Sequence, residues 1–268
     1  MLCREIMNRI EKFYPGDFAL EWDNVGLLAG RDDKEVKTVY VALDATDEVV
    51  DEAVSMKADM LITHHPLIFG GRKKITNEDF IGNRLIKLIQ NDISYYAMHT
   101  NYDVMGMAEL SGEMLHMKNA EVLEVTGHSK PSGESEASGL PEGIGRIADL
   151  EQEITLQQCA DEVKKAFSLE SVKVFGDLRS KMGRIAVCPG SGKSVIGTAL
   201  KKKADVLITG DIGHHEGIDA VAQGLSIIDA GHYGIEHIFV KDMKRFLTEQ
   251  LAEIRVEGEP IRHPFIVI

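Results

Sequence analysis

Residues 58–63 read Ala-Asp-Met-Leu-Ile-Thr, and residues 204–209 read Ala-Asp-Val-Leu-Ile-Thr. In each copy, a helical pattern precedes an apolar stretch typical of a buried strand, and a turn rich in Gly or His follows it. Residues 93–99 and 225–232 form a second matching pair, each a strand that runs into polar residues. Two matches in the same order indicate a duplicated α/β unit.

The same alternation continues along both halves of the chain. Strands are predicted at residues 36–43, 60–63, 93–98, 172–175 and 184–187, and helices at 46–56, 80–90, 156–167 and 194–202. This order is typical of βαβ units with mostly parallel or mixed sheets. We therefore predict two α/β lobes related by an approximate twofold.

Residues 126–145 are rich in Gly, Ser, Pro and Glu, which predicts a long surface loop or the seam between the lobes. The predicted first lobe is 1–125 and the second is 126–268. A C-terminal helix could pack on the first lobe. Open α/β sheets bind ligands beyond the carboxyl ends of their strands, where the His-rich turns fall.

Composition argues against several classes of protein. The 268 residues carry 30 Lys and Arg against 43 Asp and Glu, a net charge of −13 that disfavours direct DNA binding and anionic membranes. No run approaches the ~18 apolar residues of a membrane span, and residues 1–14 predict an amphipathic helix rather than a signal peptide. We expect a soluble, cytoplasmic protein.

The three cysteines are widely spaced and odd in number, which favours reduced thiols. Any metal ion must then be held by His and carboxylate side chains.

His64 and His65 follow the apolar strand at 60–63 and precede Pro66. Neighbouring side chains in extended backbone point to opposite sides, so two ligating neighbours would serve two different ions. This geometry predicts a dinuclear site. For an isolated pair, the alternative is that one His caps the strand and the other is exposed.

Two further segments supply His and carboxylate groups. His99 and Asp103 follow the next strand, where a turn built by Asn and Asp is the alternative interpretation. His232 and Glu236 are four residues apart, which places them on one helix face as either metal ligands or a surface pair. Because the segments occupy matching topological positions, together they predict a metal site.

The predicted ligands are His64, His65, Asp103, His232 and Glu236. Mixed imidazole and carboxylate ligation suits two divalent ions chosen from Zn, Mn, Fe, Co or Ni. Five ligands for two ions leave coordination positions open for water, as expected of a catalytic site.

Two other stretches could serve the same pocket. His214 and His215 follow the second copy of the repeat and could transfer protons or line the pocket. Residues 189–194 do not form a phosphate-binding P-loop, because the first required Gly would fall at Val187. Their turn could still contact an anion through backbone amides.

Several motifs together resemble one known family. The motifs are Trp22-Asp23-Asn24-Val25-Gly26-Leu27, Ile62-Thr63-His64-His65-Pro66, His99-Thr100-Asn101-Tyr102-Asp103, Cys188-Pro189-Gly190-Ser191-Gly192, Thr209-Gly210-Asp211 with His214-His215, and Gly231-His232 with Glu236. In this order they resemble the Nif-three-like family, also catalogued as type 2 homologues of GTP cyclohydrolase I. The resemblance spans nearly the whole chain.

The resemblance implies duplicated α/β/α lobes, a toroidal homohexamer and a dinuclear metal centre facing the interior of the ring. It places the family's ligands at His64, His65, Asp103, His232 and Glu236, with Glu236 as the bridge. Some members carry a ferredoxin-like domain between the halves. Here the connection is too short for that domain, so this chain resembles the short form.

The first functional hypothesis is a metal-dependent hydrolase of a nucleotide or related heterocycle. For GTP, hydroxide delivered by the metal ions would attack C8 of guanine, and this carbon would be released as formate. The alternative is a metal-stabilised toroidal scaffold that binds a regulatory protein without turnover. Metal storage is a third interpretation, which predicts exchangeable ions and no substrate pocket.

Overall fold

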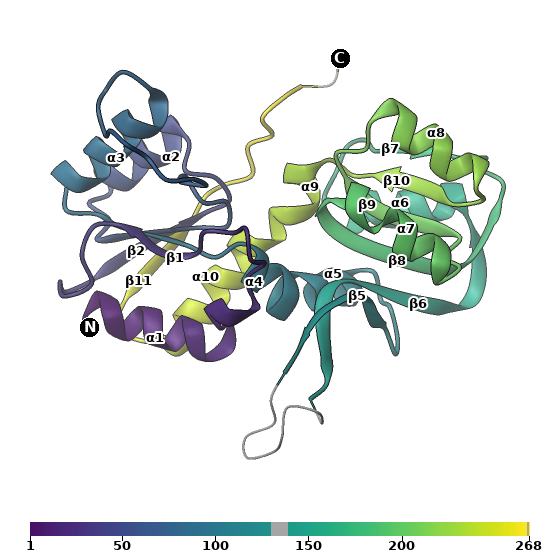
Figure 1. Cartoon of the computed structure of the whole chain (residues 1–268), viewed down its shortest axis with the longest axis horizontal. Helices are drawn as coiled ribbons and strands as arrows, with labels where there is room; N and C mark the ends of the chain where they lie inside the picture. The colour runs from purple at the N-terminus through teal and green to yellow at the C-terminus, as the bar shows by residue number, and fades with distance from the viewer. Residues whose placement is uncertain (130–138, 267) are drawn as a thin grey trace. The chain divides into compact units, whose positions relative to one another are not determined.

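The computed structural model describes residues 1–129, 139–266 and 268 (Figure 1). The chain forms two compact units. Unit 1 contains Met1–Tyr102 and His237–Arg262, and unit 2 contains Asp103–Glu236 and His263–Ile268.

Unit 1 is built on a five-stranded mixed sheet. In spatial order its strands are β1 (Gly26–Ala29), β4 (Ser94–Ala97), β3 (Met60–Thr63), β2 (Thr38–Ala42) and β11 (Arg255–Gly258). All neighbours are parallel except β1, which runs antiparallel to β4. Every residue of β3 and β4 is buried, as expected of parallel strands covered on both faces.

Helices cover this sheet on both faces. The helices of unit 1 are α1 (Cys3–Phe13), η1 (Gly16–Phe18), α2 (Asp47–Ser55), α3 (Phe80–Gln90), α4 (Thr100–Tyr102) and α10 (Ile238–Gln250). Figure 1 shows α2 and α3 on one face and α1 and α10 on the other. The apolar sides of α2 and α3 form a core with β2, β3 and β4. The polar residues that follow β3 and β4 therefore begin at the ends of fully buried strands.

Unit 2 has a six-stranded mixed sheet. In spatial order its strands are β5 (Glu121–His128), β6 (Pro141–Thr155), β8 (Lys181–Ser191), β9 (Val206–Gly210), β10 (Ser226–Asp229) and β7 (Lys173–Phe175). The helices are η2, a π-helical turn (Asp103–Met107), α5 (Ala108–Met114), α6 (Leu156–Ala166), η4 (Gly192–Val195), α7 (Ile196–Lys201), α8 (His214–Ala222) and α9 (His232–Glu236). Two mixed sheets flanked by helices confirm the predicted α/β class.

The repeat seen in the sequence is a repeat of topology. β3 lies between β2 and β4, and β9 lies between β8 and β10, with all neighbours parallel. Asp59 and Asp205 perform the same task in the two copies. Asp59 Oδ2 accepts hydrogen bonds from the backbone N–H groups of Lys37 and Thr38, at 2.8 and 2.9 Å. Asp205 Oδ2 accepts them from Gly183 and Arg184, both at 2.7 Å. The Ala-Asp pair ahead of each central strand therefore holds the neighbouring strand in register.

The prediction of a surface loop at 126–145 was wrong at both of its ends. β5 and the beginning of β6 pair antiparallel there, from Glu121 opposite Ile147 to His128 opposite Pro141. Residues 130–138 lie outside the described part of the chain. The prediction failed because a two-stranded ribbon is stabilised by backbone hydrogen bonds, which do not require an apolar side-chain pattern.

The compact units divide the chain differently from a single boundary at 125/126. Residues 103–125 belong to unit 2, where η2 and α5 pack against β6. Near the C-terminus, β11 returns to unit 1 and pairs in parallel with β2, Arg255 opposite Thr38. Pairing between segments this distant along the chain leaves no local pattern from which the boundary could be predicted.

Cysteine is a poor candidate ligand in this fold. Cys3, Cys159 and Cys188 are buried and free. Burial raises the pKa of Cys159 to about 12, so its thiol stays protonated at neutral pH. Among the residues that the structure describes, no helix is both long and apolar enough to cross a membrane.

Candidate metal centre

Unit 1 brings three histidines together at one edge of its sheet. His64 and His65 follow β3, and His99 follows the neighbouring parallel strand β4. Because parallel strands end at the same edge, these residues emerge side by side. Each offers a ligand atom, and the three atoms all lie within 4.8 Å of one another. The two predicted histidines are thus joined by His99, which was not among the predicted ligands.

An oxygen acceptor holds the Nδ1 of each of these rings. The pairs are His64 with the Met98 carbonyl oxygen (2.8 Å), His65 with Asp44 Oδ1 (2.8 Å) and His99 with Asp23 Oδ1 (2.9 Å). An acceptor at Nδ1 fixes the tautomer whose proton sits on that nitrogen, which leaves Nε2 with the lone pair that binds a metal ion.

Asp23 is the more enclosed of the two carboxylate acceptors, with a side chain that is 0% exposed against 44% for Asp44. Burial by itself would raise its pKa, but hydrogen bonds from His99 and Thr100 outweigh burial and lower the pKa to about 2. The carboxylate is therefore ionised at neutral pH. An ionised acceptor raises the basicity of the His99 ring and fixes its orientation.

Unit 2 contributes a second group of candidate ligands on α9. His232 and Glu236 occupy the two ends of this helix, and their Nε2 and Oε2 atoms are 3.0 Å apart. Two ligand atoms that share one ion at roughly right angles are separated by ~3 Å. Asp211 Oδ2 lies 2.8 Å from His232 Nδ1, so this ring is held in the same way as those of unit 1.

Asp103 supplies another carboxylate within unit 2. It begins the π-helical turn η2, a distortion that is frequent at functional sites. One of its carboxylate oxygens lies within 4.8 Å of one from Glu236. Buried Glu236 therefore has an imidazole and a second carboxylate close by, which is the donor chemistry of a site for a divalent cation.

Two glycines make room for α9. A Cβ on Gly190 would lie 2.6 Å from Glu236 Oε1, and a Cβ on Gly210 would lie 2.7 Å from the His232 backbone nitrogen. Gly190 also has φ +75°, which glycine adopts readily. The turn at 189–194, considered in the sequence as a possible anion contact, thus lies against the Glu236 carboxylate.

His214 and His215 are exposed on the first turn of α8, with ring centroids 5.2 Å apart. Their neighbour Glu216 pairs with Lys193. A role for the two histidines in proton transfer or in lining a pocket stays a prediction.

The described residues therefore include clusters of buried and half-buried His, Asp and Glu that could hold metal ions. Of the five predicted ligands, His64 and His65 belong to unit 1, and Asp103, His232 and Glu236 belong to unit 2. Their joint ligation of two ions stays a prediction.

Sequence reasoning considered His99 without selecting it as a ligand, and it missed the role of the carboxylates that hold the rings. A signal for two of these carboxylates was present. Asp44 closely follows β2 and Asp211 directly follows β9. Each of these strands neighbours the strand that leads to the corresponding histidine. Carboxylates at such strand ends are candidates for orienting ligands.

Comparison with known sequences decides the family. The sequence model of the family described as Duf34/NIF3 (NGG1p interacting factor 3) matches residues 1–263. The chain belongs to the DUF34/NIF3 family. This confirms the resemblance inferred from the motifs.

DUF34/NIF3 relatives of similar length share about a third of the sequence. A Clostridium acetobutylicum protein named GTP cyclohydrolase 1 type 2 homolog is 34% identical, over 94% of this chain and 92% of the relative. A Streptococcus pneumoniae protein of the same name is 36% identical over 93% and 91%. A Staphylococcus aureus relative of 28% identity aligns over 361 positions, more than the 268 residues of this chain. This chain is therefore a short form.

Solved structures of DUF34/NIF3 proteins and their relatives share the fold. A Bacillus cereus protein related to NIF3 superposes with a TM-score of 0.89 at 28% identity, covering 100% of this chain and 99% of that one. Reduced HcgD from Methanocaldococcus jannaschii gives a TM-score of 0.81 at 30% identity, covering 97% and 98%. The matches cover both units of the chain.

Proposed function

We propose that this protein is a metal-dependent hydrolase of a nucleotide or related heterocycle. In this proposal His64, His65, Asp103, His232 and Glu236 hold two divalent ions, and Glu236 bridges them. The relatives named GTP cyclohydrolase 1 type 2 homolog support this class of substrate.

One observation carries the proposal. Four histidines, His64, His65, His99 and His232, each have Nδ1 within 2.9 Å of an oxygen acceptor. A surface histidine has no need of such a fixed acceptor, whereas histidines that ligate metals almost always have one. The donor set contains imidazole and carboxylate without thiolate, which suits Zn, Mn, Fe, Co or Ni.

Two bound divalent ions would lower the pKa of water and stabilise negative charge on a substrate. The residues of this chain supply orientation. Asp44 and Asp211 hold the rings of His65 and His232, so these ligands need little reorganisation. In the proposed hydrolysis of GTP, two waters would add in turn at C8 of guanine, the C8–N9 and C8–N7 bonds would break, and C8 would leave as formate. Exposed His214 or His215 would exchange the protons with solvent.

A second candidate function is a metal-stabilised toroidal scaffold that binds a regulatory protein without turnover. The family description, NGG1p interacting factor 3, favours it because that description names a protein interaction. The two functions share the metal centre and differ in whether a substrate is converted.

We also propose that the protein works in the cytoplasm. Its three buried free thiols are suited to a reducing compartment, and the net charge of −13 argues against direct DNA or membrane partners.

The test begins with metal content, measured by elemental analysis of purified protein. We expect about two ions per chain in the wild type and fewer in Glu236→Gln, because the variant loses the bridging charge. Glu162→Gln is the matched control, since Glu162 is an exposed carboxylate on α6 of the same unit. Formate release from GTP is then measured with each candidate metal restored.

Each outcome assigns the site differently. Metal-dependent formate release that is lost in Glu236→Gln supports the hydrolase. Two ions per chain without release from GTP overturn GTP as the substrate and favour the scaffold. If neither purified nor metal-titrated protein retains ions, the dinuclear centre itself is refuted.

A further inference from the structure

Unit 1 contains a cavity of about 380 Å³ that the metal centre does not account for. Its lining includes Asp23, Asn24, Ile68, Phe69, Arg72 and Ile75. Small-molecule sites have volumes of ~300–1,000 Å³ and combine apolar walls with a few polar groups. This cavity has the size and the mixed lining of such a site.

Aromatic side chains connect the cavity to the histidine cluster. Phe69 lines the cavity, is 54% exposed and meets the His99 ring edge-on, with centroids 5.7 Å apart. Trp22 is 61% exposed and contacts the same ring at 5.9 Å. Exposed flat rings beside a candidate ligand provide a surface on which a planar heterocycle can stack.

Arg72 provides an anion-binding group in the same cavity. Its side chain is 23% exposed, and its Nη2 pairs with Asp79. Its Nε is buried and has no hydrogen-bond partner among the residues that the structure describes. A buried guanidinium N–H left unpaired costs free energy, and a phosphate oxygen would satisfy it with a charge-assisted hydrogen bond.

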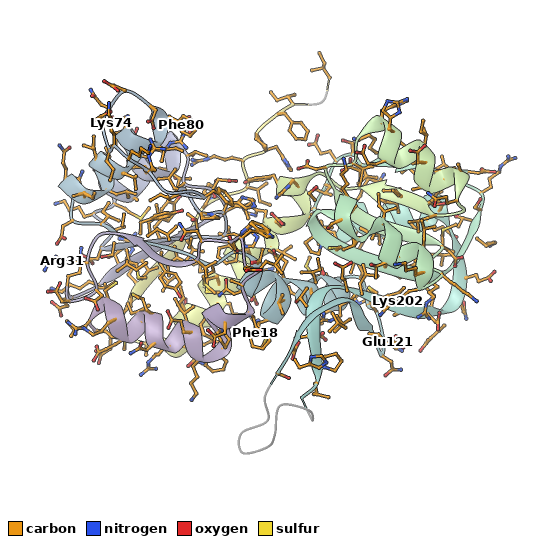
Figure 2. The ribbon with its side chains drawn as sticks, in the orientation of Figure 1. Phe18, Arg31, Lys74, Phe80, Glu121 and Lys202 are labelled. Carbon is orange, nitrogen blue, oxygen red and sulfur yellow. The ribbon has the colours of Figure 1, made fainter. Side chains whose placement is uncertain are left out.

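The local charge favours an anion at this end of the cavity. Lys73 and Lys74 follow Arg72 and are exposed, so three cations occur in succession in a chain whose net charge is −13. Figure 2 shows Lys74 on the loop ahead of α3, whose first residue, Phe80, is also labelled. Asp23 lies in the lining too, but its oxygens already accept hydrogen bonds from His99, Thr100 and Asn24. Within this cavity an anion is therefore expected at Arg72 rather than near Asp23.

We infer that this cavity binds a planar heterocycle that carries a phosphate group, with the ring against Phe69 and the phosphate on Arg72. The inference rests on the proposed function for its link to catalysis, because the ring end of the cavity adjoins His99. Binding itself does not depend on a metal ion and can be tested without one.

Trp22 makes that test specific, because it is the single tryptophan of the chain. Its fluorescence is recorded while guanosine monophosphate is added to the full-length protein in excess chelator. Guanosine, which lacks the phosphate, and ribose 5-phosphate, which lacks the ring, are titrated in parallel. We expect saturable quenching by the monophosphate and about tenfold or more weaker binding of each of the other two compounds.

Two variants separate the two ends of the cavity. Arg72→Gln is expected to lower the affinity for the monophosphate about tenfold or more and to leave the affinity for guanosine unchanged, because only the phosphate contact is lost. Phe69→Leu is expected to lower the affinity for both ligands about tenfold, because the stacking face is lost. The matched controls are Arg179→Gln, an exposed guanidinium in unit 2, and Phe80→Leu, an exposed ring at the start of α3.

The outcomes are decisive in each direction. Absence of quenching by the monophosphate overturns the site, and equal affinities for monophosphate and guanosine overturn the phosphate assignment. If Arg72→Gln unfolds at a lower temperature than the wild type, Arg72→Lys is tested in its place. The Lys variant keeps the positive charge and lacks the Nε donor. Unchanged binding in that variant overturns the role of Nε. If the protein holds metal but the monophosphate does not quench Trp22, the ligand site in the cavity is refuted and the metal centre stands. If the monophosphate quenches Trp22 but the protein holds no metal, the ligand site stands and the metal centre is refuted.

Discussion

Asp44 and Asp211 show how single residues prepare the candidate centre. Each follows a strand that neighbours the strand leading to its histidine, and each places a carboxylate oxygen 2.8 Å from Nδ1 of that ring. The contact fixes the ring before any ion arrives, which reduces the entropy lost on binding. A charged acceptor also raises the basicity of the imidazole, so its Nε2 donates an electron pair to a metal ion more strongly.

We therefore expect Asp44→Asn to lower the affinity for divalent metal by about 10–100-fold, because a neutral amide holds His65 less firmly and does not raise its basicity. Asp211→Asn should act in the same way through His232. Metal affinity is measured by competition with a chromophoric chelator. Asp17→Asn, an exposed aspartate in unit 1, is the control. Affinity equal to that of the wild type in both variants would mean that these carboxylates do not serve the ligands.

The histidines also show what a residue pattern can and cannot predict. His64 and His65 were identified because two adjacent imidazoles end an apolar strand. His99 was not selected, because beside Asn101 and Asp103 it is equally typical of a polar turn. Its place in the cluster depends on the pairing of β4 with β3, which brings Ala97 opposite Thr63. Adjacency along the chain was visible in the sequence, and adjacency across the sheet was not.

At the scale of elements, the short helix α9 depends on the turn that ends β8. Its five residues carry both His232 and Glu236, and Gly190 lies directly against the Glu236 carboxylate. Any side chain at position 190 would have to displace that carboxylate, and its backbone would be strained at φ +75°.

Gly190→Ala is accordingly expected to lower the free energy of unfolding by about 1–3 kcal/mol and to reduce metal content. Gly197→Ala is the matched control, because it lies in α7 and an added Cβ meets no atom within 4 Å. That control should keep its metal and become more stable by up to about 1 kcal/mol. Urea denaturation and elemental analysis measure both quantities. Normal metal content in Gly190→Ala would show that Glu236 does not need its present position.

The elements themselves were predicted where apolar periodicity is strong. The strand at Met60–Thr63 and the helix at Phe80–Gln90 match the predicted bounds, and the Ala-Asp repeat marks equivalent strands in both sheets. The hairpin of β5 and β6 was missed because most of its described side chains are exposed or only half-buried. Strands of this kind are specified by their partner strand rather than by their own side chains.

For the whole molecule, the resemblance implies a toroidal homohexamer. Each chain carries a net charge of −13, so assembly brings like charges together unless salt or bound cations offset them. We expect light scattering at physiological salt to give about six times the 29.6 kDa of one chain. At low ionic strength with chelator, smaller species should increase. A single-chain mass under all these conditions would refute the hexamer.

The sequence by itself determined the α/β class, the internal repeat and the strand ends at which the candidate ligands lie. These features follow from local rules, since the burial of a strand or of a helix face is written in the spacing of neighbouring residues. The placement of His232 and Glu236 on one helix face likewise follows from their spacing of four residues.

Only the tertiary structure decided that His99 joins His64 and His65, that each ring has an oxygen at Nδ1, and that Arg72 and Phe69 line one cavity. It also decided that β11 returns to β2 in unit 1. These features depend on the register between segments far apart in the chain. That register is set by the packing of the whole sheet, so no local pattern of residues contains it.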